Sequence, residues 1–365
     1  MAEIHTSKLG LLEKSMVRKF FAPKLKQKTN FFRLLALTQR SWLWIRDALI
    51  SIKKAEANEW MIIIIQDLIN QLTEWYTLSE SMKNHEYFFK EEDIALTQSA
   101  ETMGNLAEIL EEIAIELENT EKINGKIKKA MTYPVVLILF AVIAIAILLI
   151  YVIPTIVTMF PNPESLPWIT KFMIWASEFL QKTRYIITIT IAGLIVLYKF
   201  SYKNILVFKI FIDKLMITMP TVSWVVKAYY MYRFSRLLSQ LYNAWVSPTL
   251  SLKLMGNTFS NFFYKKKVME IKGNLNAGFG FAESMEWSPL FDPILVQIIH
   301  VGEDTGNITQ VLKKMSDFYR DTLQTKIDIL MSLIEPLLMA TIAIVIWVIV
   351  ASIFLPMADM VNVIT

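Results

Sequence analysis

The sequence predicts an all-α integral membrane protein with two homologous cytoplasmic helical-bundle domains, of about six helices each, and three transmembrane helices. Two observations support this prediction. The chain contains an internal repeat, and each copy of the repeat ends in a long apolar run. The 365 residues are 54% hydrophobic, with a mean hydropathy of +0.42, and 19% of them are charged. This composition is too apolar for an ordinary soluble protein and too charged for a wholly embedded one.

The internal repeat is clearest where the stretch from Glu101 to Leu106 reappears, at one constant offset, as Glu303 to Ile308. The same offset relates further positions: Leu110 and Leu312, Pro134 and Pro336, Pro154 and Pro356. Upstream, after a single-residue gap, other pairs correspond: Phe31 and Phe234, Leu34 and Leu237, Trp42 and Trp245, Glu80 and Glu283. A repeat of this length is a duplicated domain, since solenoid units have periods of about 20 to 50 residues.

Each copy contains a Gly-Asn pair, Gly104-Asn105 in the first and Gly306-Asn307 in the second. Glycine suits the left-handed residue that closes a helix, and asparagine is a preferred N-cap. A Glu or Gln three residues after each Asn adds the partner of a capping box. Both copies are therefore expected to turn sharply between two helices. Glu101 and Glu303 precede these turns, and they either bond the adjacent turn or face a partner.

Both helices that leave these turns continue into apolar runs bounded by proline, 134–154 and 336–356. Each run spans about 30 Å as a helix, the thickness of a bilayer core. Lysines before the first run place that end in the cytoplasm by the positive-inside rule. The expected order is a basic leader (1–29), a first cytoplasmic helical domain (30–130), a first transmembrane helix (131–157), an outer loop with an interfacial helix (158–183), a second transmembrane helix (184–200), a second cytoplasmic domain (201–328), a third transmembrane helix (329–355) and an outer tail (356–365).

Two of these segments are less sharply defined. The leader is either an amphipathic segment on a membrane or partner surface, or a flexible solvated extension. The second crossing has only about 21 Å of helix between Arg184 and Lys199. It is nevertheless required if both repeats have the same orientation, because the chain must then cross back between them. The amino terminus is expected inside and the carboxyl terminus outside.

The chain shows no pattern of a catalytic, cofactor or metal site. It has no cysteine, its histidines His5, His85 and His300 are scattered, and it has no Walker A motif or catalytic triad. The net charge of +4 is small and the lysines cluster beside apolar runs, which favours lipid headgroups over nucleic acid as a partner. Trp42, Trp60 and Trp75 are expected in the core.

Glu335 lies inside the last apolar run, beside Pro336. An ionisable group in such a run raises a functional hypothesis. It either has a structural role, in which it pairs with a neighbouring helix or extends to the membrane interface, or it takes part in proton relay or ion coupling. No second charge lies in the equivalent run, where Tyr133 precedes Pro134.

The chain resembles the type II secretion F domain family, the inner-membrane platform proteins of type II secretion and type IV pilus assembly. The most specific matches are Gly302 to Ile308, the Tyr133-Pro134 and Glu335-Pro336 pairs, and Phe354-Leu355-Pro356. The first copy departs from the pattern, with Ala100 where the second has Gly302.

This resemblance implies a non-enzymatic scaffold in the bacterial inner membrane that links a cytoplasmic assembly ATPase to pilin or pseudopilin subunits, binds other inner-membrane assembly components and forms a homo-oligomer. The basic cluster Lys265, Lys266 and Lys267 would face either that ATPase or lipid. The alternative function is a small transporter with parallel repeats, which should show paired polar residues or broken helices near mid-membrane. The sequence shows neither.

Overall fold

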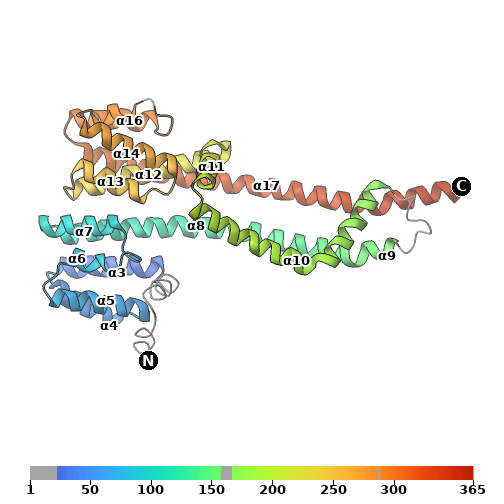
Figure 1. Ribbon diagram of the computed structural model, residues 1–365, viewed down its shortest axis with the longest axis horizontal. Helices are drawn as coiled ribbons and strands as arrows, with labels where there is room; N and C mark the ends of the chain where they lie inside the picture. Colours follow the sequence, from blue (N-terminus) through green and yellow to red (C-terminus); the bar gives the residue numbers. More distant parts are fainter. Residues whose placement is uncertain (1–22, 158–166, 287, 365) are drawn as a thin grey trace. The chain divides into compact units, whose positions relative to one another are not determined.

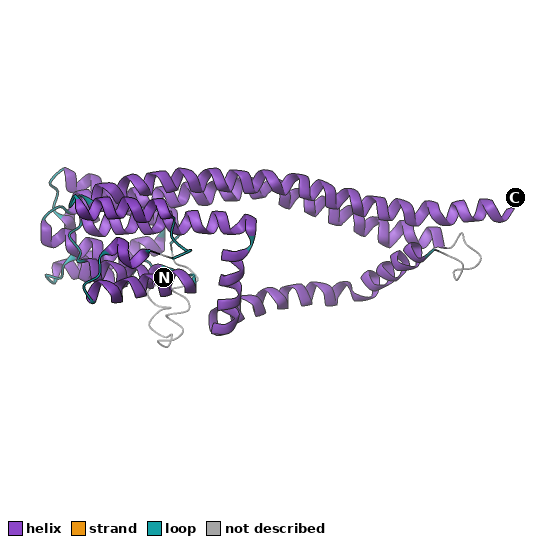
Figure 2. Cartoon of the chain, turned by 90° about the horizontal axis from the view of Figure 1, so that it is seen from above, coloured by secondary structure: helices purple, strands orange, loops and turns teal. Residues whose placement is uncertain are grey.

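The structure, a computed structural model, describes residues 23–157, 167–286 and 288–364. Throughout these residues the chain forms helices and connecting loops, without strands (Figure 2). Most of the predicted leader, 1–29, and the start of the predicted outer loop lie outside the described residues.

Each repeat contributes six helices to the described structure (Figure 1). The first repeat comprises α3 (Leu25–Arg40), α4 (Ile45–Ala55), α5 (Glu59–Thr73), α6 (Leu78–Lys83), α7 (Glu91–Met103) and α8 (Leu106–Ile147). The second comprises α12 (Pro220–Asn243), α13 (Pro248–Thr258), α14 (Phe262–Asn276), α15 (Phe281–Met285), α16 (Pro293–Asp304) and α17 (Ile308–Ile364). Each helix has its counterpart at the corresponding position of the other repeat, so the duplication extends to the fold.

The chain divides into two compact units. Unit 1 contains Met1–Gly125 and Met216–Gln324, and unit 2 contains Lys126–Leu215 and Thr325–Thr365. The two helical bundles, which we predicted as separate domains over 30–130 and 201–328, therefore pack together in unit 1. The reason is a buried polar interface between the repeats, described below.

Left-handed residues occupy equivalent places in the two bundles. Positive φ angles occur at three pairs of positions: Trp42 (56°) and Trp245 (58°), Trp75 (70°) and Gly278 (93°), Gly104 (75°) and Gly306 (66°). At the end of α5, the N–H of Trp75 bonds the carbonyl of Leu72 and the N–H of Tyr76 bonds that of Gln71, at 3.3 and 3.1 Å. This is the Schellman pattern that closes a helix with one left-handed residue.

The prediction that Trp42 and Trp75 lie in the core is wrong. Both indoles are 95% exposed, and Trp60 is half-buried. The tryptophans at 42 and 75 occupy the left-handed position after a helix, and at that corner the side chain points away from the bundle. The first bundle is instead filled by aliphatic and aromatic residues of its helices, including Phe31, Phe32 and Phe89.

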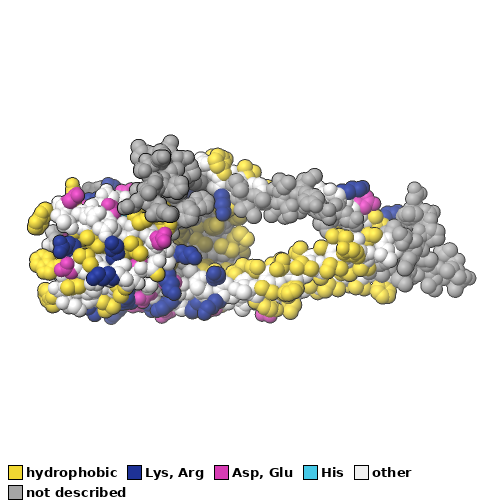
Figure 3. Space-filling view, turned by 90° about the horizontal axis from the view of Figure 1, so that it is seen from below, with side chains coloured by type: hydrophobic (Ala, Val, Ile, Leu, Met, Phe, Trp, Pro, Cys, Tyr) yellow, Lys and Arg dark blue, Asp and Glu magenta, His cyan; other side chains and the backbone are white. Residues whose placement is uncertain are grey.

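Within the described residues, two helices are long and apolar enough to cross a membrane. They cover Leu106–Thr155 and Ile308–Ser352, and only 11% and 6% of their most apolar stretches are buried. Such exposed apolar surface distinguishes them from the core helices of a soluble protein, and Figure 3 shows yellow side chains along the long helices. α17 runs unbroken through Pro336 and Pro356, so the predicted tail 356–365 is helical as far as Ile364.

The first of these helices changes its winding near its end. A π-helical segment, η1 (Leu148–Val152), joins α8 to α9 (Ile153–Val157). Pro154 lies just beyond η1, and proline lacks the N–H that would bond the carbonyl four residues earlier. A wider turn at this place accommodates the proline ring.

The predicted interfacial helix and second crossing form one continuous helix, α10 (Trp168–Asn204), followed by α11 (Leu206–Thr218). In unit 2, Ile153, Met173 and Ile349 form a small core between α9, α10 and α17. The Thr170 hydroxyl donates to the Ser352 carbonyl at 2.8 Å. α10 thus packs against both long helices.

Candidate functional site

The candidate site is the interface between the two repeats within unit 1, which we call the inter-repeat interface. It joins α7 and α8 of the first repeat to α12 and α13 of the second. Near the end of α7, the Ser99 hydroxyl donates to the carbonyl of Ala244, and at the start of α7 the Asn257 amide donates to Glu91 at 2.7 Å. Between these contacts, Leu96 and Leu237 line a common cavity. The interface therefore combines apolar packing with specific polar contacts.

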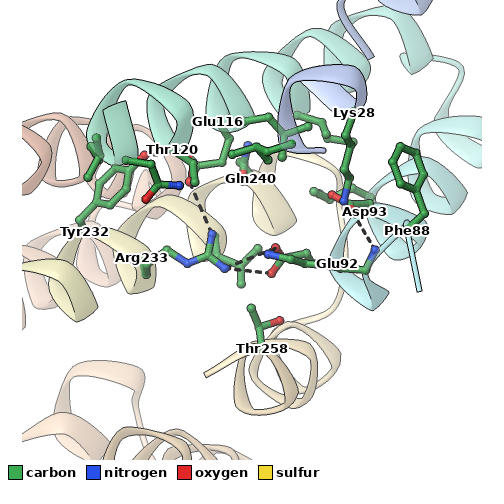
Figure 4. A pocket seen from close by; sticks show the side chains of 18 of the residues that line it. Lys28, Phe88, Glu92, Asp93, Glu116, Thr120, Tyr232, Arg233, Gln240 and Thr258 are labelled. Atoms are coloured by element: carbon green, nitrogen blue, oxygen red, sulfur yellow. Dashed lines mark hydrogen bonds and ion pairs between the residues drawn. The ribbon is translucent and has the colours of Figure 1, made fainter. Parts of the chain in front are cut away.

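Arg233 of α12 lies at the centre of the inter-repeat interface (Figure 4). Its guanidinium is 3.3 Å from Glu92 of α7 and 3.5 Å from Glu116 of α8. All three side chains are nearly buried. A buried charge is tolerated only when it is paired, so this cation holds two helices of the other repeat in place.

Glu116 has two further partners on α12. The Tyr232 hydroxyl donates to its carboxylate at 2.6 Å, and the guanidinium of Arg236 lies 3.3 Å away. One turn earlier on α8, the carbonyl of Glu112 accepts from the Gln240 amide at 3.2 Å. α8 is therefore bonded to α12 over successive turns.

The same α8 helix also bonds to α3 of its own repeat. Arg33 of α3 contacts Glu118 at 2.5 Å, and Arg40 of α3 pairs with Glu111. α8 thus presents acidic side chains to two homologous helices, α3 and α12. A second cation, Lys28 of α3, pairs with Asp93 at the start of α7.

The electrostatics of the cluster follow from burial and pairing. Burial opposes ionisation of Glu92, but Arg233 and Lys90 outweigh it and lower the pKa of that carboxyl to about 2. Burial also opposes the charge on Arg233, and the attraction of Glu92 raises its pKa above the usual value. Burial is the main cause that raises the pKa of the Tyr232 hydroxyl, and the negative charge of Glu116 raises this pKa further. At neutral pH, Glu92 and Arg233 therefore form an ionised pair, and the Tyr232 hydroxyl is neutral.

A cavity of about 490 Å³ opens between these residues. Its lining carries both signs of charge, because Lys28, Lys90 and Arg233 stand opposite Glu92, Asp93 and Glu116. Among the described residues, no group of three or more His, Cys, Asp or Glu side chains is placed to hold a metal ion. The arrangement is suited to holding the two repeats together.

Glu101 and Glu303 make equivalent contacts in the two repeats. Glu101 accepts from the backbone N–H of Leu78, at the start of α6, at 2.6 Å. Glu303 accepts from the N–H groups of Phe281 and Ala282, at the start of α15, at 2.6 and 2.8 Å. Each carboxylate satisfies free N–H groups at the amino end of a helix more than twenty residues earlier in the chain. The structure places these bonds on a distant helix, and the adjacent turn is not their partner.

The Gly-Asn turns are formed with one difference from expectation. Gly104 and Gly306 are left-handed, and the N–H of Asn307 bonds the carbonyl of Gly302 at 3.0 Å. The expected side-chain caps are absent from these two described turns. The Asn105 side-chain oxygen is buried without a hydrogen bond, and the Asn307 amide donates to Gln310 at 2.7 Å. The backbone carbonyl of Asn105 accepts the first helical bonds instead.

The remaining predicted residues do not gather at this site. Pro134 and Pro336 lie inside α8 and α17, and Glu335 is exposed on α17. The other three, Lys265, Lys266 and Lys267, lie on α14. Lys267 bonds Glu270 at 2.8 Å, while the first two lysines are exposed.

The sequence analysis did not identify the charged residues at the inter-repeat interface. Their signal lay in differences between equivalent positions: Glu92 corresponds to Ile294, Glu116 to Phe318, and Arg233 to Asn30. A charge present in one copy and absent from the other marks a surface that the two repeats use differently.

Comparison with known proteins adds independent findings. The family model described as "Type II secretion system (T2SS), protein F" matches residues 31–154 and 234–356, once in each repeat. The chain is 26% identical over 302 residues to the type IV pilus assembly protein PilC of Pseudomonas aeruginosa, covering 82% of this chain and 81% of that one. It is 31% identical over 280 residues to the type IV pilus assembly protein TapC of Aeromonas hydrophila, covering 76% and 68%. It is 28% identical over 293 residues to the type II secretion system protein F of Vibrio cholerae, covering 80% and 72%.

Proposed function

Because this chain belongs to the type II secretion system protein F family, we propose that it is an inner-membrane platform protein of a type IV pilus or type II secretion machine. Its work is to couple a cytoplasmic assembly ATPase to the assembly of pilin or pseudopilin subunits. The proposal rests on the family match over both repeats and on the two exposed apolar helices of the described chain. Its relatives are named for type IV pilus assembly and for type II secretion.

The proposed topology has three crossings, with the amino terminus inside and the carboxyl terminus outside. Both helical bundles belong to unit 1, which supports placing them on the same side of the membrane. Because α8 and α17 both leave those bundles, the chain must return once between them, and α10 supplies a helix long enough to do so. Reporter fusions at residues 120, 170, 260 and 365 should report inside, outside, inside and outside. Any other alternation contradicts this topology.

Exposed tryptophans support a protein-binding role for the first bundle. Trp42 and Trp75 follow α3 and α5, and Trp44 is also exposed. Large aromatic side chains, tryptophan above all, are enriched in the energetic centres of protein interfaces. We assign this group of tryptophans to partner binding, with the cytoplasmic ATPase as the proposed partner.

Co-purification of the full-length protein with its ATPase in detergent tests this assignment. Trp42→Ala combined with Trp75→Ala should weaken capture, and replacement of Lys265 and Lys266 by Glu should do so if the lysine cluster faces the ATPase. Trp245→Ala, which removes the equivalent tryptophan of the second bundle, is the matched control. Undiminished capture by the double tryptophan variant would reject the assignment.

Deletion tests the function as a whole. Loss of the chain should abolish surface filaments or secretion while prepilin synthesis and processing continue, and the purified protein should not hydrolyse ATP.

Glu335→Gln separates the two roles proposed for that residue: a local structural role leaves assembly intact, whereas a coupling role stops assembly at normal protein level. A protein that bound neither pilin nor ATPase, yet moved a solute into proteoliposomes, would favour a transporter.

A further inference from the structure

The inter-repeat interface is made from different surfaces of the two repeats. The first repeat contributes α7 and α8, and the second contributes α12 and α13. Each repeat carries both types of surface, but the interface uses one type from the first repeat and the other type from the second. The remaining surface of each repeat is therefore unused. These are the α16 and α17 surface of the second repeat and the α3 surface of the first.

The unused surface on α16 and α17, which we call the α16/α17 face, carries exposed apolar side chains. Ile294, Val301 and Phe318 are 55%, 49% and 51% exposed. Their counterparts in the first repeat are Glu92, Ser99 and Glu116, which contact α12. The second repeat thus leaves three large apolar side chains exposed at the positions where the first repeat contacts α12.

The unused surface on α3, which we call the α3 face, is also exposed. Leu34 and Leu37 are 40% and 52% exposed, and Asn30 lies beside them, also exposed. Their counterparts on α12 are Leu237, Gln240 and Arg233, which lie in the inter-repeat interface. The α3 face therefore corresponds to the surface of α12 that binds the first repeat. No repeat is bound to the α3 face itself.

The two unused faces have changed together. At the inter-repeat interface, Arg233 meets Glu92 and Glu116. In the unused faces the cation is replaced by Asn30 and both anions are replaced, by Ile294 and Phe318. Arg233 placed against Ile294 and Phe318 would be a buried charge without a partner. The second cation of the interface, Arg236, corresponds to Arg33, which is paired with Glu118 of its own repeat. The replacements therefore suit the two unused faces to each other, and Arg233 rejects the α16/α17 face.

We propose that the α16/α17 face of one copy of this chain binds the α3 face of a second copy, in the manner of the inter-repeat interface. The occupant is a second copy because this chain already shows how the two surface types pack, and because the replacements on the two faces complement each other. The contact is heterologous, so copies join head to tail, and the rotation at each contact decides whether they close into a ring. The new element beyond the expected homo-oligomer is the pair of faces, and the inference depends only on the structure of unit 1.

Cysteine crosslinking tests the contact directly, since the chain has no cysteine of its own. Gln240 bonds Glu112 at the inter-repeat interface at 3.2 Å, and the equivalent positions are Leu37 and Lys314. Leu37→Cys and Lys314→Cys chains, co-expressed as full-length proteins in membranes and treated with a short bis-maleimide, should form a crosslinked dimer. Neither chain alone should do so, because a heterologous contact needs one cysteine from each face.

The matched control is the pair Lys83→Cys and Glu270→Cys, two exposed positions outside both faces, which should not crosslink. Three results would overturn the proposal. The first is the absence of a crosslinked dimer in the mixture. The second is equal crosslinking by either single variant, which indicates an isologous contact. The third is crosslinking of Lys314→Cys to a pilin in place of a second copy.

A charge-restoration experiment tests the chemistry of the faces. Phe318→Glu or Asn30→Arg alone should reduce the crosslinked dimer about tenfold, because each places an unpaired charge in the contact. The two together reproduce the Glu116 and Arg233 pair and should restore the dimer. Both positions are exposed, and far-ultraviolet circular dichroism checks that the fold is retained. Unreduced crosslinking in the single variants, or failure of the combined variant to recover, would refute the proposed pairing.

Discussion

Replacing Arg233 with Met removes the cation at the centre of the inter-repeat interface while keeping much of its volume. Glu92 is then left with a side chain that is only 9% exposed and with Lys90, 3.4 Å away, as its remaining cationic partner. Glu116 keeps both Arg236 and Tyr232. The substitution therefore leaves one buried carboxylate poorly paired.

The size of the effect follows from the geometry. Unit charges 3.3 Å apart, the separation of Arg233 and Glu92, attract by about 5 kcal/mol at an effective dielectric constant of about 20. Desolvation of both groups offsets part of this attraction, and breaking a buried pair costs about 3 to 5 kcal/mol. Because Lys90 remains, we expect a loss near the lower limit, about 3 kcal/mol in the free energy of unfolding. Adding Glu92→Leu should recover at least half of the loss, since no unpaired carboxylate then remains.

The loss should depend on pH. The pKa of Glu92 falls from 4.5 to about 2 on folding, so its stabilising contribution is complete above about 4.5 and disappears as the pH drops towards 2. In Arg233→Met, the carboxyl loses this partner and takes up a proton more readily in acid. The difference between the variant and the parent protein should therefore be smaller at pH 3 than at pH 7.

Urea unfolding of the full-length protein in detergent, followed by tryptophan fluorescence, measures both effects. Arg320→Met is the matched control, because its pairs with Asp317 and Asp321 are exposed and should contribute less than about 1 kcal/mol. A loss below about 1 kcal/mol for Arg233→Met at pH 7, or the same loss at pH 3, would show that Arg233 does not hold the repeats together.

Three further substitutions test the corners of the fold by the same unfolding measurement. Gly302→Ala should cost about 1 to 3 kcal/mol, because its new Cβ would lie 3.1 Å from the Cα of Ile308; an unchanged midpoint would mean that α17 shifts freely. Trp75→Gly should stabilise the protein by about 1 kcal/mol, because the indole is exposed and the left-handed backbone is strained for a residue with a Cβ; a lower midpoint would show that the indole makes a stabilising contact. Glu303→Ala should cost about 0.5 to 2 kcal/mol by exposing the amino end of α15, and no loss would mean that water replaces the carboxylate there.

Features that depend on local residue order and on repetition can be predicted from the sequence alone. The left-handed glycines at 104 and 306 were predicted correctly, because a helix corner is decided by a few adjacent residues. The apolar runs predicted the two long exposed helices, because length and hydropathy need no tertiary contact. The family was predicted from the duplicated motif and is confirmed by the match in both repeats.

Contacts between residues far apart in the chain became visible only in the folded structure. Trp42 was expected inside because tryptophan is apolar, and it lies outside because the corner after α3 turns its side chain away. Glu101 bonds a helix end that lies far from it in sequence, and Arg233 bonds Glu92 from the other repeat. Local patterns cannot specify such pairs, since the energy of each comes from burial that exists only after the two bundles have packed together.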